Sequence, residues 1–317
     1  MSRVLIVGAG LTGSLCACLL RRELQSKVHI VVWDKSRGAG GRMSTSRSPD
    51  PSSHPADLGA QYISATPAYA QSHQRYHTPE HTTPNYHHTP EHVTVNHNTP
   101  EHITRNYHHC TRRGASWEVK RKVGESETFD AVVLTMPVPQ ILQLEGDVGP
   151  LLSVQQKQQL DGVAYSSRFA LALFFPPDAV FSFPWGARYV SESDCIRYIA
   201  VDPRKCRSDP AGRGPSMVVH TSVPFGVEHL EEDKEEVKPV ILQELYKLLP
   251  DLPQPISIKC HKWRYSQVLT TVPDCPGHMT VLNQPPLVCG GDAFTHSNFD
   301  GCVESALSLL GALKSSL

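Results

Sequence analysis

The first 34 residues alternate between short apolar runs and one helical pattern. Ser2–Val7 is a nearly continuous apolar run of strand length, and residues 28–33 form a second one. Between them, apolar residues of the segment 14–24 recur at the spacing of one helix face. A strand, a helix and a second strand in this order form a βαβ unit with parallel strands. The pattern therefore predicts a parallel α/β fold for this part of the chain.

Further apolar runs, rich in β-branched and aromatic residues, predict strands over the rest of the chain. The expected strands are residues 115–122, 129–134, 168–175, 195–202, 216–221 and 256–263. Amphipathic patterns predict helices at residues 231–249 and 299–313. The middle strands alternate imperfectly, as in a sheet with one partly solvated face.

Residues 77–110 differ from the rest of the chain. TPEH occurs at 78–81, 89–92 and 99–102, and NYHH occurs at 85–88 and 106–109. Large aliphatic residues are scarce and prolines are frequent, so the segment can bury little and cannot sustain a helix. We expect this TPEH/NYHH repeat to be a disordered insertion without chemistry; translation of repetitive sequence in a faulty gene model would also produce it.

Two alternatives for the repeat are a metal site and a solenoid. Nine of the 17 histidines fall within it, but zinc or copper needs a scaffold that fixes four ligands, and the segment offers none. A solenoid needs an apolar face on each unit for stacking, which these units lack. We therefore predict no metal site.

Length and composition narrow the class of protein. A chain of 317 residues suits two ordinary domains, and 30 basic against 31 acidic residues give a net charge of -1. This balance offers no complementary surface to nucleic acid or to an anionic membrane, and no run of about 18 apolar residues could span a bilayer. The nine scattered cysteines contain no CxxC pair, which is typical of reduced thiols. We expect a cytoplasmic monomer, with secretion as the alternative.

A glycine motif joins the first strand to the helix. Gly8, Gly10 and Gly13 form GxGxxG directly after the strand, and Asp34 ends the second strand 21 residues beyond Gly13. The first glycine suits a tight turn, the second lets the backbone approach a pyrophosphate, and the third lets the helix pack on the strand. The helix N-terminus offers N–H groups to phosphates, and Asp34 can accept hydrogen bonds from ribose hydroxyls. This context indicates a dinucleotide-binding fold rather than a glycine turn in another α/β protein.

A second loop rich in glycine and arginine, SRGAGGRM at 36–43, follows the ribose acid at once. An NAD dehydrogenase does not need this loop, whereas FAD extends its pyrophosphate and ribityl chain past the first loop. Arg42 can pair with phosphate through its planar guanidinium, and Gly40 and Gly41 leave clearance for the backbone. The loop therefore favours FAD over NAD.

Several longer motifs resemble the amine-oxidase class of FAD flavoproteins. The first are DKSRGAGGRMST (34–45) and DLGAQYI (57–63), and CGGDAF (289–294) with SNFDGC (297–302) is similar to the closing FAD motif of that class. Four segments resemble one branch of the class: LTMPVPQILQL (134–144), AYSSRFALALFF (164–175), HTSVPFGV (220–227) and KCHKWRYSQV (259–268). The resemblance covers residues 1–76 and 114–317.

The resemblance implies an α/β fold in which a Rossmann-like FAD-binding domain is interleaved with a mixed-sheet α+β substrate domain. The FAD-binding domain would comprise residues 1–63, 114–147 and 283–317, and the substrate domain residues 148–282. The positions that match the adenosine and pyrophosphate site are Gly8, Gly10, Gly13, Asp34, Lys35, Arg42 and Met43. The flavin-facing turn matches Gly59, Ala60, Gln61 and Tyr62.

The closing motif supplies the remaining cofactor residues implied by the resemblance. Asp292 matches the acid that binds the ribityl and phosphate region. Phe299, Asp300 and Gly301 open the last helix, whose N-terminus would point at the flavin N1/O2 edge. A helix N-terminus stabilises the negative charge that a reduced flavin carries there.

In one respect the chain departs from the family. Related flavoproteins place a helical segment and a strand–turn–helix–strand between DLGAQY and the strand at 129–134; one strand clasps the adenine and the helical segment covers the active site. Here only residues 115–122 are expected to remain as a strand, and the repeat replaces the rest. We therefore expect a bare sheet edge, a partly unheld adenine and impaired turnover.

The expected reaction is hydride transfer to flavin N5, followed by reoxidation with O2 and release of H2O2. Hydride transfer needs placement of the donor carbon and no strong base, which suits a sequence without a carboxylate pair or triad. The resemblance to the branch implies isomeric dihydro forms of NAD(P)H as donors, returned to NAD(P)+. The residues expected to line the substrate face are Tyr62, His220, Trp263 and Arg264. His220 and Trp263 could instead be core residues, and Arg264 could form a surface ion pair.

Two other functions stay open. The first is amine oxidation by an FAD-dependent monoamine oxidase, which usually attaches flavin to a cysteine and frames the amine with two aromatic rings. Cys302 lies one residue past Gly301 and the sequence presents no evident aromatic pair, so we expect non-covalent FAD. The second is a non-catalytic protein, either a partner-binding fold or the product of defective splicing.

Overall fold

The computed structural model describes residues 1–36, 38–49, 51–62, 66–73, 93–97, 109–121, 124–205 and 212–317. The chain forms two compact units. Unit 1 comprises Met1–Gly41, Tyr62–Ala164 and Val268–Leu317, and unit 2 comprises Arg42–Gln61 and Tyr165–Gln267. The chain therefore passes between the units four times.

The bounds of the units differ from the expected domain bounds. Residues 42–61 belong to unit 2, because Ala56 and Leu58 pack on its sheet, while residues 148–164 and 268–282 belong to unit 1. The Gln156 side chain donates to the Thr280 carbonyl at 2.9 Å, which links the last two segments. The local pattern of apolar and polar residues could not show these contacts, because the partners are far apart along the chain.

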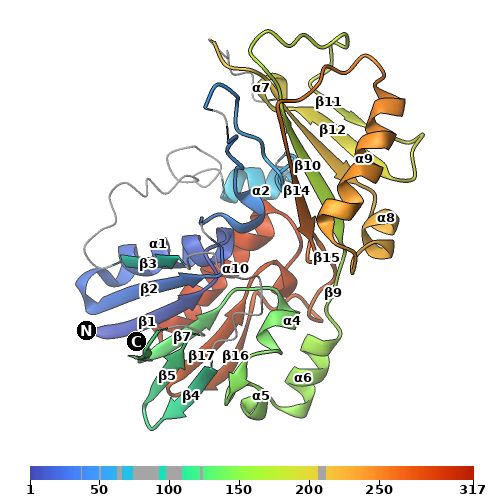
Figure 1. The fold of residues 1–317 in the computed structure, drawn as a ribbon. Coiled ribbons are helices and arrows are strands. Elements are labelled where there is room, and N and C mark those ends of the chain that lie inside the picture. The colour runs from blue at the N-terminus through green and yellow to red at the C-terminus, as the bar shows by residue number, and fades with distance from the viewer. Residues whose placement is uncertain are drawn as a thin grey trace. The chain divides into compact units, whose positions relative to one another are not determined.

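The main sheet of unit 1 has six strands in the order β16-β17-β7-β1-β2-β3 (Figure 1). In this order the strands are His278–Asn283, Pro286–Gly290, Ala131–Leu134, Ser2–Val7, Val28–Asp34 and Val93–His97. All neighbours are parallel except β16 and β17. Helices α1 (Leu11–Leu24) and α10 (Phe299–Lys314) share one apolar core with the sheet. Parallel strands are normally buried by helices in this way.

Strand β3 lies within the TPEH/NYHH repeat, where we expected no strand. It pairs with β2 in parallel register, from Ile30 opposite Val93 to Asp34 opposite His97. The expectations of disorder and of a bare sheet edge beyond β2 are therefore wrong for residues 93–97. The expectation of disorder is also wrong for residues 109–110, which begin β4. The physical reason is the VTV run at 93–95, since β-branched residues favour a pleated backbone. Residues 77–92 and 98–108 of the predicted insertion lie outside the described residues.

A second sheet in unit 1 has the order β6-β5-β4-β8. Its strands are Ser126–Phe129, Ser116–Lys120, His109–Arg113 and Glu145–Gly146. Trp117 of β5 is buried, and its indole N–H donates to the carbonyl oxygens of Pro285 and Pro286 at 3.3 and 3.1 Å. The strand expected at 129–134 is divided, because β6 ends at Phe129 and β7 begins at Ala131.

Short elements complete unit 1. The helices are α2 (Pro67–Ser72), α4 (Val138–Ile141), α5 (Val148–Leu151) and α6 (Val154–Asp161), with 3-10 turns at Gln25–Lys27 and Asp292–Phe294. A third 3-10 turn, Gly41–Met43, begins with the last residue of the first unit 1 segment and continues into unit 2. Two further short strands, β9 (Ala164–Tyr165) and β15 (Val268–Thr270), lie where the chain passes between the units.

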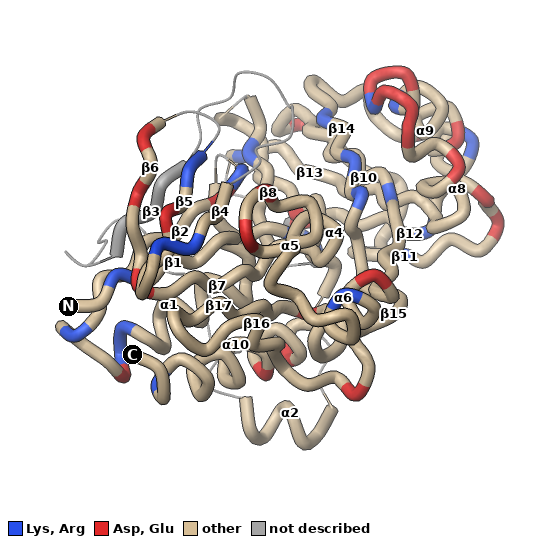
Figure 2. The backbone as a smooth tube through the Cα atoms, turned by 90° about the horizontal axis from the view of Figure 1, so that it is seen from below, with Lys and Arg blue, Asp and Glu red and all other residues tan. Residues whose placement is uncertain are grey.

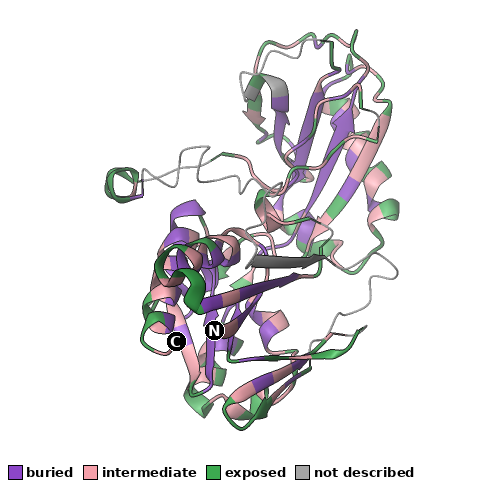
Figure 3. Ribbon diagram, turned by 90° about the vertical axis from the view of Figure 1, so that its left-hand side faces the viewer, coloured by how far each residue is buried: buried purple, intermediate pink, exposed green. Residues whose placement is uncertain are grey.

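Unit 2 is built on an antiparallel sheet in the order β11-β12-β13-β10-β14. The strands are Ala187–Tyr189, Ile196–Val201, Ser216–Thr221, Arg168–Phe174 and Ser257–Trp263. Most of their residues are buried (Figure 3). Helices α7 (Asp202–Lys205), α8 (Val223–Glu228) and α9 (Lys234–Leu248) connect them. The observed β13 has the bounds expected from the sequence.

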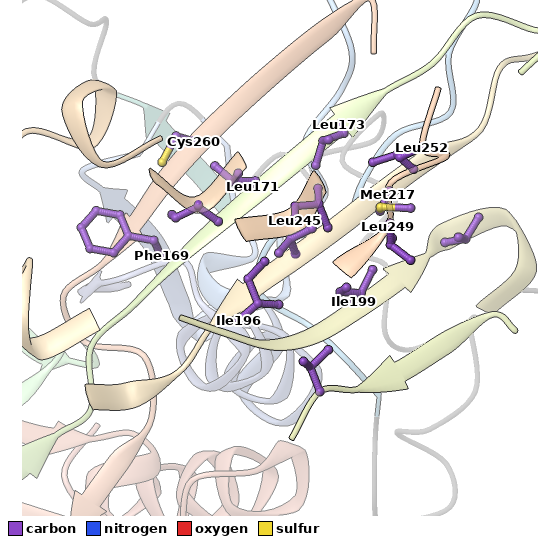
Figure 4. Packing of buried hydrophobic residues seen from close by; sticks show 14 of the residues in the cluster. Phe169, Leu171, Leu173, Ile196, Ile199, Met217, Leu245, Leu249, Leu252 and Cys260 are labelled. Atoms are coloured by element: carbon purple, nitrogen blue, oxygen red, sulfur yellow. The ribbon is translucent and has the colours of Figure 1, made fainter. Parts of the chain in front are cut away.

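The two faces of the unit 2 sheet have different partners. On one face, Leu171 and Leu173 pack in the same cluster as Leu245 of α9 (Figure 4). On the other face, Ala170 and Ala172 pack with the segment 42–61. Because side chains of a strand alternate between faces, a single strand serves both layers.

Acidic residues gather at the start of α9 (Figure 2). The Asp233 carboxylate accepts a hydrogen bond from the Glu235 N–H at 2.7 Å, and Glu235 and Glu236 occupy the first turn. Carboxylates at this end stabilise the helix dipole, so the acidic cluster has a local structural role.

Two further findings concern the cysteines and the question of membrane-spanning helices. The eight cysteines within the described ranges are all free thiols. Among the helices of those ranges, none has the length and apolar character needed to cross a membrane.

We predict that Gly13→Ala destabilises the protein, because an added Cβ would lie 2.0 Å from the Gly8 carbonyl oxygen and 2.7 Å from Thr135 Oγ1. The expected loss is about 1–3 kcal/mol of unfolding free energy, as for other overpacked sites. Chemical denaturation measures it. Gly311→Ala is the matched control, because a Cβ there meets nothing within 4 Å in α10. It should stabilise by about 0.5–1 kcal/mol; equal effects of the two variants would contradict the prediction.

Candidate functional site

The glycine motif of unit 1 forms an open cradle at the start of α1. Gly8 has φ +110°, which allows the tight turn, and it donates its N–H to the Trp33 carbonyl of β2 at 2.7 Å. Gly10 is the N-cap of α1 and supplies no side-chain cap, and a Cβ on it would meet nothing within 4 Å. Gly13 lies against the Gly8 carbonyl, so each glycine has the geometry expected of it. The uncapped N–H groups of α1 can therefore receive an anion.

The second glycine loop lies directly against the first. Gly40 donates its N–H to the Ala9 carbonyl at 2.7 Å, and Gly10 and Gly40 form an isolated parallel bridge. A Cβ on Gly41, which has φ +53°, would lie 3.3 Å from the Gly10 Cα. The two loops are therefore in direct contact.

Asp34 ties the two loops together. Its Oδ2 accepts the Ala9 N–H and its Oδ1 accepts the Ser36 N–H, both at 2.6 Å. A carboxylate has about four acceptor positions, so two backbone bonds leave capacity for ribose hydroxyls. Lys35, the next residue, is exposed.

The closing motif also lies in unit 1. Asp292 is buried and its Oδ2 accepts the Ser297 hydroxyl at 3.0 Å. Asp300, in the first turn of α10, is wholly buried, and its Oδ1 lies 3.0 Å from Nδ1 of His73. Phe299 is buried beside it, and Gly301 donates its N–H to Asn298 Oδ1 at 2.7 Å. The start of α10 is thus fixed by a side-chain cap and by a carboxylate–histidine contact.

The residues around Asp300 include a cluster that the sequence analysis missed. The Tyr69 hydroxyl donates to Glu304 at 2.8 Å, and the Tyr69 ring stacks on His73 with centroids 5.1 Å apart. Burial and the adjacent Glu304 carboxylate raise the pKa of Tyr69 to about 12. Tyr69 and Glu304 are 235 positions apart, so local pattern carried no signal of their contact.

In unit 2, the segment 42–61 brings two groups of candidate residues together. The Thr45 hydroxyl donates to Asp57 Oδ1 at 2.8 Å. A Cβ on Gly59 would lie 2.1 Å from the Arg42 carbonyl oxygen, so only glycine permits this approach. Arg42 donates to the Ser266 carbonyl at 3.2 Å, and Met43 is exposed. The candidate phosphate ligand Arg42 thus lies beside the candidate flavin-facing turn.

A row of side chains crosses the sheet face that carries this segment. Cross-strand pairing aligns Tyr189, Tyr198, His220, Ala170 and His261 on five successive strands. The rings of Tyr189 and Tyr198 lie 5.1 Å apart, and those of Tyr198 and His220 lie 5.8 Å apart. The two tyrosines are nine positions apart, which explains why the sequence showed no evident aromatic pair. Partners on neighbouring strands are the signal that could have revealed them.

Gln61 connects this row to the segment 42–61. Its Nε2 lies 3.3 Å from Nδ1 of His220, and its Oε1 accepts the Tyr189 hydroxyl at 3.4 Å. With the amide in this orientation Nδ1 of His220 is the acceptor, so the neutral ring carries its proton on Nε2. His220 is almost wholly buried and is therefore held in one orientation.

The remaining predicted substrate residues have other positions. The Trp263 indole N–H donates to the Leu58 carbonyl at 3.0 Å, so this side chain supports the segment 42–61. The Arg264 guanidinium makes two contacts with the Glu231 carboxylate, at 2.8 and 2.9 Å, and both residues are exposed. This is the surface ion pair given as the alternative for Arg264. Ala60 and Tyr62 lie in the candidate flavin-facing turn, residues 59–62, and the Tyr62 side chain is 64% exposed.

These residues fit FAD. An uncapped helix N-terminus, an open glycine at the N-cap and a carboxylate with free acceptor positions match a pyrophosphate and a ribose. Gly8, Gly10, Gly13 and Asp34 would hold the adenosine and pyrophosphate, with Lys35, Arg42 and Met43 as further candidates.

Comparison with known proteins gives family and fold. Residues 6–78 match the NAD(P)-binding Rossmann-like domain, and residues 111–308 match the flavin containing amine oxidoreductase family. The chain is 44% identical to renalase of Mus musculus over 339 aligned positions, covering 99% of each chain.

Solved structures share the fold at low sequence identity. Cyclohexylamine oxidase from Brevibacterium oxydans IH-35A superposes with a TM-score of 0.64 at 11% identity, and a CLA-producing fatty acid isomerase from P. acnes with 0.61 at 12%. The alignments cover 99% of both chains for the oxidase, and 96% of this chain and 97% of the isomerase. The two names denote different reactions, so this likeness establishes architecture alone. The family match and the 44% identical relative show that the chain belongs to the flavin-containing amine oxidoreductases and is an FAD-dependent enzyme.

Proposed function

We propose that this FAD-dependent oxidase takes a hydride from isomeric dihydro forms of NAD(P)H and gives NAD(P)+ and H2O2. The observation that carries the proposal is the row Tyr189–Tyr198–His220–Ala170–His261. Its members are aromatic or small, and none is a carboxylate. Planar rings of this kind suit a neutral dihydronicotinamide ring, whereas a cationic amine gains more from a carboxylate or a cage of ring faces.

The chain's own residues would bind and orient the donor. His220, fixed by Gln61, presents its Nε2 proton in a buried setting, where a hydrogen bond to a nicotinamide carboxamide would be strong. Tyr189 is exposed and can contact the donor directly. When bound, FAD supplies the chemistry that these residues lack, which is acceptance of a hydride and transfer of two electrons to O2.

Amine oxidation is the second candidate, because Tyr189 and Tyr198 do form an aromatic pair. Their centroids lie 5.1 Å apart, so the rings contact each other. Two rings in contact leave no gap between them for an amine, which makes this candidate the weaker one.

We also propose a cytosolic monomer that uses O2 and a small dinucleotide donor. The free thiols of the described residues support a reducing compartment over secretion. Cell fractionation tests the cytosolic location, and size-exclusion chromatography tests the monomeric state.

Steady-state kinetics with matched substrates test the function. The purified protein should release H2O2 with isomeric dihydro forms of NAD(P)H and at most slowly with primary amines. The reverse preference would establish amine oxidation, and a chain that carries no flavin would support a non-catalytic protein. A companion chain, with residues 77–113 exchanged for the intact family segment, measures whether the repeat slows turnover.

We predict that FAD is bound non-covalently. Denaturation followed by filtration should release all of the flavin, measured by its absorbance near 450 nm. Cys302, the cysteine of the closing motif, lies in α10 and is half-buried. Flavin retained on the polypeptide would contradict the prediction.

We predict that Asp34→Ala weakens FAD binding by about 1–3 kcal/mol, because ribose hydroxyls lose a charged acceptor and the Ala9 N–H loses its partner. Fluorescence titration of the apo-protein measures the change. Glu23→Ala is the control, since this exposed carboxylate of α1 pairs with Lys314 at 3.0 Å. Equal affinities of the two variants would mean that Asp34 does not contact the cofactor.

We predict that His220→Phe lowers kcat/KM for dihydronicotinamide donors about 10- to 100-fold per bound flavin, because the ring loses its N–H donor. Thr221→Val is the control, since the Thr221 hydroxyl accepts the Phe169 N–H at 2.9 Å and Phe169 belongs to the core cluster that includes α9. Equal kinetics in the two variants would exclude a substrate role for His220.

A further inference from the structure

We propose that Asp202 is a positioning residue that fixes the backbone of the DLGAQ segment, residues Asp57–Gln61. The inference rests on the proposed function for the role of this segment, because the segment matches the flavin-facing turn. It adds Asp202, the residue directly after β12, which no sequence motif singled out.

The Asp202 carboxylate contacts the first residue of the segment. Asp202 directly follows β12 and is buried, and its Oδ2 accepts the Asp57 N–H at 2.8 Å. A carboxylate is costly to bury unless hydrogen bonds compensate its lost hydration, and a bond to a charged acceptor is stronger than a neutral one. The Asp202 contact therefore fixes the backbone of Asp57 firmly.

Other side chains hold the residues that follow. Trp263, at the end of β14, donates to the Leu58 carbonyl at 3.0 Å, and His220 of β13 lies 3.3 Å from Gln61. Three strands of one sheet therefore supply contacts to the segment. His220 lies in β13 and Trp263 in β14, and Asp202 directly follows β12. The segment is fixed at its first, second and last residues.

The central residue of the segment transmits any displacement. Gly59 lies against the Arg42 backbone so closely that a Cβ would be 2.1 Å from the Arg42 carbonyl oxygen. A shift of Asp57 would therefore move the candidate phosphate ligand Arg42 as well as Gln61 and its contact with His220. The apolar contacts of Ala56 and Leu58 with the sheet do not depend on the Asp202 carboxylate, so its loss should affect position more than folding.

The experiment compares three variants as apo-proteins. Asp202→Ala removes the acceptor, Asp202→Asn keeps an acceptor oxygen, and Thr221→Val removes a buried side-chain acceptor from a backbone N–H elsewhere in the same sheet. Two measurements are made on each: FAD affinity by fluorescence titration, and amide hydrogen exchange of residues 57–61 without FAD. The second measurement needs neither cofactor nor turnover.

Asp202→Ala should weaken FAD binding about tenfold and accelerate exchange at residues 57–61. Asp202→Asn should recover most of both losses, and Thr221→Val should change neither. Equal FAD affinity and equal exchange in Asp202→Ala and Thr221→Val would overturn the proposal, as would faster exchange without loss of affinity. If the wild-type chain binds no FAD, the proposed function is wrong and the positioning role for flavin falls with it, while the exchange data still show whether Asp202 fixes the segment.

Discussion

The geometry of both units depends on direct contact between stretches of backbone, which only glycine allows. In unit 1, Gly13 of α1 lies on the Gly8 carbonyl, so the helix N-terminus is placed immediately after the first strand. In unit 2, Gly59 lies on the Arg42 carbonyl, so the two ends of the segment 42–61 meet. A methyl group at either position would separate elements whose closeness defines the candidate site.

Buried carboxylates provide the second shared feature. Asp202, Asp292 and Asp300 are each buried and each lie at or near the start of a helical turn, where helix dipoles and N–H groups favour negative charge. Each also contacts a donor: the Asp57 N–H, the Ser297 hydroxyl and His73 respectively. Such groups fix loops in one arrangement, since a displaced buried carboxylate would lose its compensating bonds.

The sequence predicted best what short-range pattern determines. The strands β1, β2 and β13, the glycine turn and Asp34 follow from residues close together along the chain. It failed where contact joins distant residues. Tyr69 with Glu304, and Tyr189 with Tyr198 and His220, meet only through tertiary packing. Strand β3 was missed for another reason, because prolines and histidines around the VTV run concealed its β propensity.

The four passages of the chain between the units have a consequence for synthesis on the ribosome. Residues 42–61 emerge more than a hundred positions before the strands on which they pack, since β10 begins at Arg168. The Rossmann-like sheet likewise lacks β17 and α10 until residues 286–314 are made. Both units therefore have high contact order, and such topologies fold slowly while unpaired apolar segments stay exposed. A nascent chain therefore carries unpaired apolar segments until α10 has left the ribosome.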